Sequence, residues 1–236
     1  MTDMKLRVKF RLNRYPSYPE TFSELELLKE KTALIIIDMQ NDFLHPQGGF
    51  AKKGVDVSGA AKLIPLVKQV ADSCRQAGIP VIYTLHTFRS DFSDRPKMYY
   101  ELMRQRQGES ANPVAPATVG LIKDSWNAAV IDELSPTAKD IILDAKHNFD
   151  SFYQTDLELI LRNLGIENLI FTWVTCSICV ETTLRSAYHR DFRCLLVEDC
   201  TWEKQADQEA ATKKTIAMNF GYLVTSEDIL RTLNNG

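Results

Sequence analysis

Apolar residues follow two patterns that alternate along the whole chain. Short runs rich in β-branched and apolar residues have the length and character of buried parallel strands. They fall at residues 33–37, 79–85, 140–143, 168–174, 192–197 and 222–224. Between most of them, apolar residues recur at helical spacing, with expected helices at residues 58–77, 155–164, 180–188, 207–219 and 226–233. This alternation predicts one three-layer α/β/α Rossmann-like domain with a mostly parallel sheet of about six strands.

The first part of the chain does not share this alternation. We expect residues 1–30 to form an N-terminal extension and residues 31–236 to form the α/β domain. Within the extension, Lys5 to Leu12 alternates weakly, and Ser23 to Glu30 has room for one or two helical turns. Such an arm packs either on a neighbouring subunit or on its own domain.

One long segment between two expected strands lacks any regular pattern. Residues 86–124 are polar and rich in Arg, Gln, Asn and Pro, with a possible helix at 97–106. Long loops inside compact domains are usually functional or disordered. We therefore interpret this segment as a wall or lid of the functional site.

Composition narrows the classes of function. With 44% hydrophobic and 25% charged residues, the chain has enough apolar material for a full core. A net charge of −3 argues against a nucleic-acid or membrane-surface partner, and no apolar run is long enough to span a bilayer. The five cysteines show no disulfide-framework spacing, so we expect a cytoplasmic protein with reduced thiols.

The junction between the strand at 168–174 and the helix from Val180 carries the clearest chemical signal. The change from strand to helix takes only a few small residues, which places Cys179 at or near a helix N-terminus. Unpaired N–H groups and the helix dipole favour negative charge there, so a thiol ionises more easily. We therefore expect Cys179 to be a catalytic nucleophile.

Two further reactive side chains follow other strands. Asp38 ends the run at 33–37, and Lys146 follows the run at 140–143. In open parallel sheets, ligands bind beyond the carboxyl ends of the strands. Asp38, Lys146 and Cys179 are therefore expected to meet on one rim of the sheet.

Three motifs in this order resemble those of the isochorismatase-like cysteine hydrolases. They are Ile-Ile-Ile-Asp-Met-Gln-Asn-Asp-Phe at 35–43, Lys-His-Asn-Phe-Asp-Ser-Phe-Tyr-Gln-Thr at 146–155 and Val-Thr-Cys-Ser-Ile-Cys-Val-Glu-Thr-Thr at 174–183. The resemblance covers roughly residues 31 to 233 and is nearest to the ureidoacrylate and biuret amidohydrolase type. Trp173, Cys176, Ser177 and Asp150 depart from the usual residues of the family.

The resemblance implies metal-independent hydrolysis of an amide, ureido or carbamoyl compound through a thioester. Cys179 would attack the carbonyl group, Asp38 would carry the proton and Lys146 would supply positive charge. The oxyanion site would be the backbone N–H groups of Thr175 and Cys179, with a cis peptide joining Val174 to Thr175. No cofactor is implied, and no catalytic metal, because the region of His86 lacks the second histidine of the metal-binding relatives. The family also suggests a homodimer or homotetramer.

Several residues near these motifs are candidates for contact with a small-molecule substrate. Gln40 and Asn41 could bind substrate or hold loop backbone, and Arg89 could anchor a polar group or belong to a solvated lid face. The aromatic side chains of Phe43, Tyr153 and Trp173 could line the pocket or belong to the core. The side-chain amide of Asn219, which is distant in the sequence, could add one contact.

Three other interpretations compete with an amidohydrolase. The first is a vinyl-ether hydrolase of the isochorismatase kind, in which Cys179 would be a bystander. The second is a non-catalytic binding module on the same fold. The third is a redox or zinc role for Cys176 and Cys179, which form a Cys-x-x-Cys pair without a second pair elsewhere in the sequence.

Overall fold

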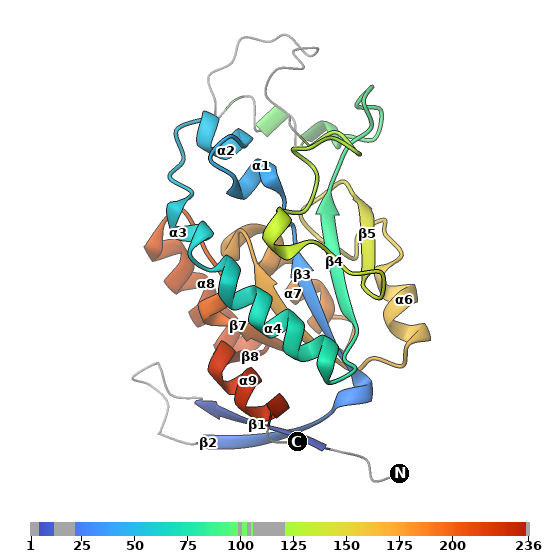
Figure 1. The fold of residues 1–236 in the computed structure, drawn as a ribbon, viewed down its shortest axis with the longest axis vertical. Coiled ribbons are helices and arrows are strands. Elements are labelled where there is room, and N and C mark those ends of the chain that lie inside the picture. The colour runs from blue at the N-terminus through green and yellow to red at the C-terminus, as the bar shows by residue number, and fades with distance from the viewer. Residues whose placement is uncertain (1–4, 12–21, 99–100, 103–104, 106–120, 235–236) are drawn as a thin grey trace.

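The computed structural model describes residues 5–11, 22–98, 101–102, 105 and 121–234 (Figure 1). Within these residues, six strands form one parallel sheet in the order β5-β4-β3-β6-β7-β8. The strands are β3 (Thr32–Ile37), β4 (Val81–His86), β5 (Ile141–Lys146), β6 (Asn168–Trp173), β7 (Arg193–Val197) and β8 (Tyr222–Val224). The predicted parallel α/β/α architecture is confirmed.

The order of the strands reverses between β3 and β6. From β3 the chain first builds outward through β4 to β5, and it then returns to the other side of β3 to add β6, β7 and β8. Helices that leave the two neighbouring strands therefore turn to opposite faces, which opens a crevice at the carboxyl ends. This switch point is where a ligand site is expected in such a sheet.

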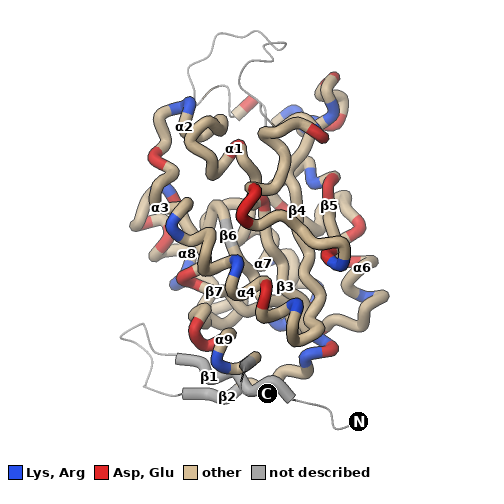
Figure 2. Tube along the Cα trace, in the orientation of Figure 1, with Lys and Arg blue, Asp and Glu red and all other residues tan. Residues whose placement is uncertain are grey.

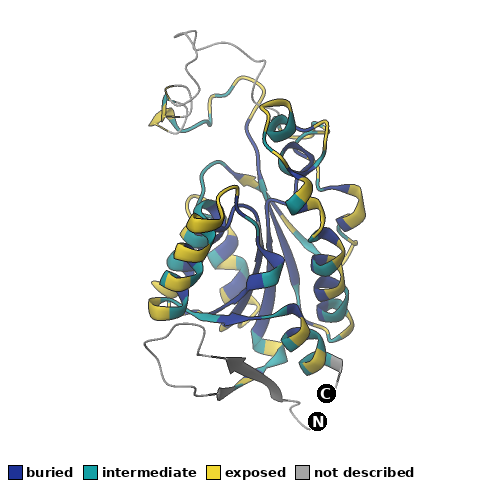
Figure 3. Cartoon of the chain, turned by 90° about the vertical axis from the view of Figure 1, so that its left-hand side faces the viewer, coloured by how far each residue is buried: buried dark blue, intermediate teal, exposed yellow. Residues whose placement is uncertain are grey.

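The central strand explains the layered core. Residues 33–37 of β3 are all fully buried, as expected for a strand covered on both faces. Leu34 and Ile36 pack into one hydrophobic cluster, whereas Ala33, Ile35 and Ile37 pack into the other. The period of two along the strand thus supplies both cores (Figure 3).

Helices cover both faces of the sheet. On one face lie α4 (Ile64–Gln76) and α9 (Ser226–Asn234). On the other lie α6 (Leu157–Asn163), α7 (Glu181–Tyr188) and α8 (Ala206–Asn219). The central strands carry few charged residues, which lie mainly on helices and connecting segments (Figure 2). Among the described residues, no helix is long and apolar enough to cross a membrane.

Several short helical pieces connect these elements. Between β3 and α4 the described chain forms the short helices α1 (Asn41–Leu44), α2 (Gly49–Lys52) and α3 (Ser58–Ala61). Three are 3₁₀ turns: η1 (Lys29–Lys31), η3 (Asp132–Leu134) and η5 (Glu198–Cys200).

The helix predicted over residues 58–77 is in fact two helices. The short α3 ends at Ala61, and α4 begins at Ile64 with Pro65 in its first turn. Proline has no N–H to donate to the preceding turn and is best tolerated at the start of a helix. The prediction of a single helix was wrong because it ignored this residue.

The N-terminal extension forms a β-hairpin. β1 (Lys5–Arg11) pairs antiparallel with β2 (Phe22–Leu28) and lies near α9 and β8 of the same chain. The predicted helical turns at 23–30 are therefore wrong. Leu25 and Leu27 pack against the core while Glu26 between them is exposed, and this alternation is typical of a strand.

The lid segment is described only in part. Residues 97–98 and 101–102 are helical, and the remainder of the helix predicted at 97–106 lies largely outside the described residues. The two ends of the segment are paired, because Phe88 N–H donates to Leu121 O and Lys123 N–H donates to Phe88 O, both at 2.8 Å. This pairing fixes where the segment leaves and rejoins the domain beside β4.

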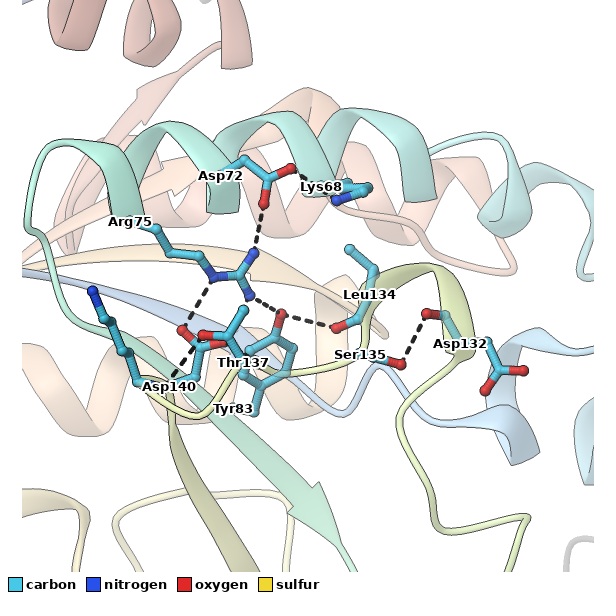
Figure 4. Close-up of polar contacts among 10 residues, drawn as sticks. Lys68, Asp72, Arg75, Tyr83, Asp132, Leu134, Ser135, Thr137 and Asp140 are labelled. Carbon is cyan, nitrogen blue, oxygen red and sulfur yellow. Dashed lines mark hydrogen bonds and ion pairs between the residues drawn. The ribbon is translucent and has the colours of Figure 1, made fainter.

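A polar network joins α4 and β4 to the start of the edge strand β5 (Figure 4). The Arg75 guanidinium donates to both carboxylate oxygens of Asp140 at 3.1 and 2.8 Å and to the Tyr83 hydroxyl at 2.9 Å. The Tyr83 hydroxyl in turn donates to Leu134 O at 3.0 Å. These residues join α4, β4 and the connection to β5 away from the carboxyl ends of the strands.

Candidate active site

Three strands bring Asp38, Lys146 and Cys179 into contact at the switch point. Asp38 follows β3, Lys146 ends β5, and Cys179 lies in the turn after β6. Lys146 Nζ is 2.5 Å from Asp38 Oδ2 and 3.7 Å from Cys179 Sγ. Asp38 and Lys146 are fully buried, and Cys179 is 7% exposed. The sequence thus predicted which side chains meet and at which edge of the sheet.

Asp38 is held by contacts to both of its carboxylate oxygens. Thr84 Oγ1 on β4 donates to Oδ1 at 3.0 Å, and Lys146 binds Oδ2. The Asp38 N–H donates to Thr84 O at 2.9 Å. Asp38 has a φ of 55°, a left-handed conformation that Asp and Asn tolerate better than most residues. The backbone therefore leaves the strand direction at the residue that carries the carboxylate.

The turn that carries Cys179 differs from the predicted helix start. Residues Cys176–Val180 form a π-helical turn, η4, before α7 begins at Glu181. Val180 N–H donates to Thr175 O at 3.4 Å, and Ile178 N–H donates to the same oxygen at 3.1 Å. The peptide between Val174 and Thr175 is cis, as the family resemblance implied. Single π turns of this kind are frequent at functional sites.

Burial favours a protonated Cys179 thiol, whereas the neighbouring Asp38 favours a charged Lys146. Burial raises the pKa of the Cys179 thiol to about 12, although the positive charge of Lys146 opposes this effect. Burial works against the Lys146 charge, but Asp38 and Cys179 outweigh it, and the pKa of Lys146 is raised above its usual 10.5. Desolvation thus opposes the easy ionisation that the sequence analysis expected at this position, and it outweighs the nearby positive charge.

Glu203 holds the turn that carries Cys179 through hydrogen bonds, and the sequence analysis did not identify it. Its Oε2 accepts hydrogen bonds from Ser177 Oγ at 2.5 Å and from Ser177 N–H at 3.1 Å. The neighbouring Trp202 O accepts from Cys176 N–H at 2.9 Å. Glu203 is 6% exposed and lies in the connection between β7 and α8. Only the unusual Ser177 of the motif pointed in this direction.

Gln40 and Asn41 both bind backbone groups around the site. The Gln40 amide donates to His86 O and Ala128 O at 2.9 and 2.8 Å, and its oxygen accepts from His86 N–H at 2.9 Å. Asn41 Nδ2 donates to Trp126 O at 2.8 Å. Both side chains thus hold loop backbone, which was one of the two predicted roles, and substrate contact stays a prediction.

The remaining candidates for substrate contact are dispersed. Phe43 packs edge to face on Phe50, with ring centroids 5.0 Å apart, whereas Tyr153 is 52% exposed. The Arg89 side chain is 69% exposed and lies 3.7 Å from Asp91. The structure does not describe the Trp173 side chain.

Asn219 is not brought to the site. It ends α8 immediately before β8 and lines a hollow together with Asn168 and Arg193, which begin β6 and β7. This hollow lies at the amino ends of the strands, the opposite edge of the sheet from Asp38. The structure thus contradicts the prediction that Asn219 contacts the substrate.

His86 completes a group of side chains that could coordinate a metal ion. One donor atom each of Asp38, His86 and Cys179 lies within 4.8 Å of the others, and all three residues are buried. Carboxylate, imidazole and thiolate donors suit zinc. The Lys146 ammonium, however, contacts Asp38 and Cys179 and places a positive charge where a cation would bind. This positive charge disfavours a bound cation, and the expectation of no catalytic metal stays a prediction.

A buried Asp–Lys–Cys cluster at the switch point of a parallel sheet defines a cysteine-hydrolase type of site. The sequence profile of the isochorismatase domain matches residues 32–228, so the chain belongs to the isochorismatase family. Ureidoacrylate amidohydrolase RutB of Rhizobium rhizogenes is 30% identical over 232 residues, which cover 93% of this chain and 89% of the relative. RutB of Pantoea ananatis is 34% identical, covering 79% of this chain and 74% of the relative.

Solved structures lead to the same family. A cysteine hydrolase from Pseudomonas syringae pv. phaseolicola superimposes with a TM-score of 0.76 at 25% identity, covering 89% of this chain and 95% of the other. N-carbamoylsarcosine amidase from Thermoplasma acidophilum gives a TM-score of 0.63 at 25% identity, with coverages of 84% and 97%. The chain is thus a hydrolase that acts on carbon–nitrogen bonds other than peptide bonds.

Proposed function

We propose that the protein is a metal-independent cysteine amidohydrolase that cleaves a C–N bond of a small ureido, carbamoyl or primary amide substrate. The observation that carries the proposal is the contact of Lys146 Nζ with both Asp38 Oδ2 and Cys179 Sγ in a buried cluster. The site contains the nucleophile and the proton carrier that amide hydrolysis needs. Similarity to ureidoacrylate amidohydrolases and to N-carbamoylsarcosine amidase supports this class of substrate.

The reaction begins from a protonated thiol. A carboxylate oxygen of Asp38 lies within 4.8 Å of Cys179 Sγ, and burial raises the pKa of the thiol to about 12. Asp38 therefore takes the S–H proton as Sγ attacks the carbonyl carbon and the C–S bond forms. Asp38 next gives this proton to the leaving nitrogen, and the C–N bond breaks. Ammonia or an amine departs, and the acyl group remains on Cys179 as a thioester.

Water completes the cycle with the same groups. Asp38 takes a proton from the water molecule, whose oxygen attacks the acyl carbon. The C–S bond then breaks, and the proton returns to Cys179 as the acid product leaves. Lys146 keeps its charge throughout and stabilises whichever of Asp38 and Cys179 is negative.

The oxyanion formed on the carbonyl oxygen needs donors that are in place before the reaction. We assign these to the N–H groups of Thr175 and Cys179, at the two ends of the turn after β6. Contacts from Glu203 to Ser177 and from Trp202 to Cys176 support this assignment because they hold the turn between the two donors.

Substitution of Cys179 by alanine tests the proposal. Ammonia release is measured for wild type and variant over a panel that includes ureidoacrylate, biuret, N-carbamoyl amino acids and simple primary amides. We expect wild-type turnover of at least one compound and its loss in C179A. Intact mass after brief exposure to that compound should show one acyl group, placed on Cys179 by peptide mapping.

Three outcomes would contradict the proposal. Undiminished turnover in C179A would exclude the thioester, and turnover of isochorismate by C179A would indicate vinyl-ether hydrolysis instead. A failure of iodoacetamide to label Cys179 ahead of the other four thiols, which are 0–1% exposed, would favour a non-catalytic module.

Two properties of the protein in the cell follow from the same proposal. We infer a cytoplasmic enzyme because all five cysteines are free thiols. We also expect self-association into a dimer or tetramer. Light scattering measures the mass in solution, and a mass near 26.9 kDa would contradict this expectation.

A further inference from the structure

His86 is a buried group at the active site to which the proposed mechanism gives no role. It ends β4 and is 1% exposed. One of its ring nitrogens lies within 4.8 Å of both a carboxylate oxygen of Asp38 and Cys179 Sγ. At this separation, a substrate whose carbonyl carbon is bonded to Sγ has its neighbouring atoms within reach of the imidazole.

The protein holds His86 from several sides. The Gln40 side chain binds both the N–H and the C=O of its backbone, each at 2.9 Å. The imidazole packs edge to face on Phe88 and Phe149, with ring centroids 5.0 and 6.4 Å away. Gln40 is thus a positioning residue for this histidine, because it fixes the end of the strand that carries the ring.

The ring is neutral at physiological pH. Burial, and then the positive charges of Lys146 and His147, hold the pKa of His86 well below its usual 6.5. A neutral imidazole keeps one nitrogen as a hydrogen-bond acceptor, whereas a protonated one only donates. His86 therefore offers an acceptor beside a cluster that is otherwise rich in donors.

A ureido, carbamoyl or amide substrate needs such an acceptor. Its carbonyl oxygen takes hydrogen bonds, but its N–H groups must donate them, and an unpaired N–H in a buried site is costly. Asp38 already accepts from Thr84 and Lys146. A second acceptor facing Cys179 would bind the N–H that Asp38 does not reach.

We propose that the His86 imidazole is a catalytic residue that accepts a hydrogen bond from an N–H group of the bound substrate and thereby selects amides over esters. The inference rests on the proposed amidohydrolase function and deepens it, since it names the group that recognises the scissile C–N bond. It assigns substrate recognition to β4, in addition to the three strands that carry Asp38, Lys146 and Cys179.

The test compares an amide with the ester of the same acid, which lacks the N–H group. Wild type and His86→Leu are assayed on pairs such as propionamide with methyl propionate. We expect His86→Leu to lower kcat/KM for the amide by roughly 10- to 100-fold and to change the ester little. An equal loss on both substrates would overturn the proposal, because a merely structural role does not distinguish them.

Two acceptor-bearing variants keep the test valid if His86→Leu folds poorly. The carbonyl oxygens of His86→Asn and His86→Gln stand near the positions of Nδ1 and Nε2. One of the two variants should recover amide turnover and so identify the nitrogen that accepts the hydrogen bond. Failure of both variants in folded protein would count against a hydrogen-bond acceptor at His86. His189→Leu, on the opposite edge of the sheet, is the matched control and should behave as wild type.

A second readout does not depend on turnover. Iodoacetamide carries N–H groups and methyl iodoacetate does not, and the alkylation of Cys179 by each is followed by intact mass. Wild type should prefer iodoacetamide more strongly than His86→Leu does. If His86→Leu prefers iodoacetamide as strongly as wild type does, the role of His86 is refuted. If this preference changes but wild type hydrolyses no amide, only the proposed function is refuted.

Discussion

Removal of the Lys146 charge should separate stability from activity. The ammonium is fully buried and lies 2.5 Å from Asp38 Oδ2, which is also fully buried. In Lys146→Met the carboxylate would keep the Thr84 hydroxyl as a partner but would lose its counter-charge. Breaking a buried ion pair in this way costs about 3–5 kcal/mol of unfolding free energy.

A second substitution should recover most of this loss. In Lys146→Met/Asp38→Asn the unpaired charge is gone, and Asn tolerates the φ of 55° at this position. We expect the double variant to unfold within about 1–2 kcal/mol of wild type, because replacement of a buried ion pair by neutral groups is often nearly neutral. Both variants should be inactive, since neither has the proton carrier together with its cation.

Urea denaturation at pH 7, followed by circular dichroism, measures these differences. The single variant should also melt about 6–20 °C below wild type, at roughly 2–4 °C per kcal/mol. Lys68→Met, from an exposed ion pair with Asp72, serves as the control and should change stability by less than about 1 kcal/mol. A single variant as stable as wild type, or a double variant no more stable than the single, would refute this account of the pair.

Three other predictions concern the turn held by Glu203, the Cys179 thiol and the network around Arg75. Glu203→Gln should lower kcat by roughly 10-fold with little change in melting temperature, because a charged acceptor for Ser177 becomes neutral; an unchanged kcat would show that this brace is dispensable. The rate of Cys179 alkylation by iodoacetamide should keep rising with pH beyond 9, because burial raises the pKa of the thiol to about 12; a plateau below pH 8 would indicate a stable thiolate. Arg75→Met should cost about 2–4 kcal/mol, measured by urea denaturation, because it leaves the buried Asp140 carboxylate without its cation. Its activity should stay within about twofold of wild type at 25 °C, and a large loss would connect this network to the site.

The sequence predicted which three side chains meet because each of them follows a strand of the parallel sheet. The run ending at Ile37 is so uniformly apolar that Asp38 stands out as the first polar residue beyond the sheet. Lys146 and Cys179 lie a few residues beyond two other expected strands. Because parallel strands end at one edge, these residues had to share that edge whatever the loops did.

Asn219 was misplaced for a reason that topology explains. A crossover helix runs antiparallel to the strands that it connects, so the end of α8 must lie at the amino edge of the sheet. A residue at that position cannot reach the carboxyl edge.

The pairing of β1 with β2 was missed for a different reason. The alternating pattern is short, and it identifies a strand only once Leu25 and Leu27 are seen to pack on the domain.

Contacts between distant segments were beyond sequence reasoning. Glu203 meets Ser177 from 26 residues away, and Gln40 meets His86 from 46 residues away. Neither pair belongs to a pattern with a fixed spacing. The raised pKa of Cys179 likewise depends on how completely the folded chain excludes water, which local sequence does not specify.

The raised pKa of the Cys179 thiol also bears on the expected effect of the helix N-terminus, which was to favour a thiolate. A thiolate formed in advance would need the positive charge of Lys146 for itself, yet this ammonium lies closer to Asp38, at 2.5 Å, than to Cys179 Sγ, at 3.7 Å. In the proposed reaction the carboxylate loses its negative charge when it takes the S–H proton, and the charge moves to the carbonyl oxygen as the C–S bond forms. A buried neutral thiol reacts slowly with electrophiles that the site does not bind, because thiolate is the nucleophilic form. Under the proposed mechanism, the burial that opposes ionisation would make the site selective, because Asp38 would make Cys179 reactive only when a bound carbonyl group is in place.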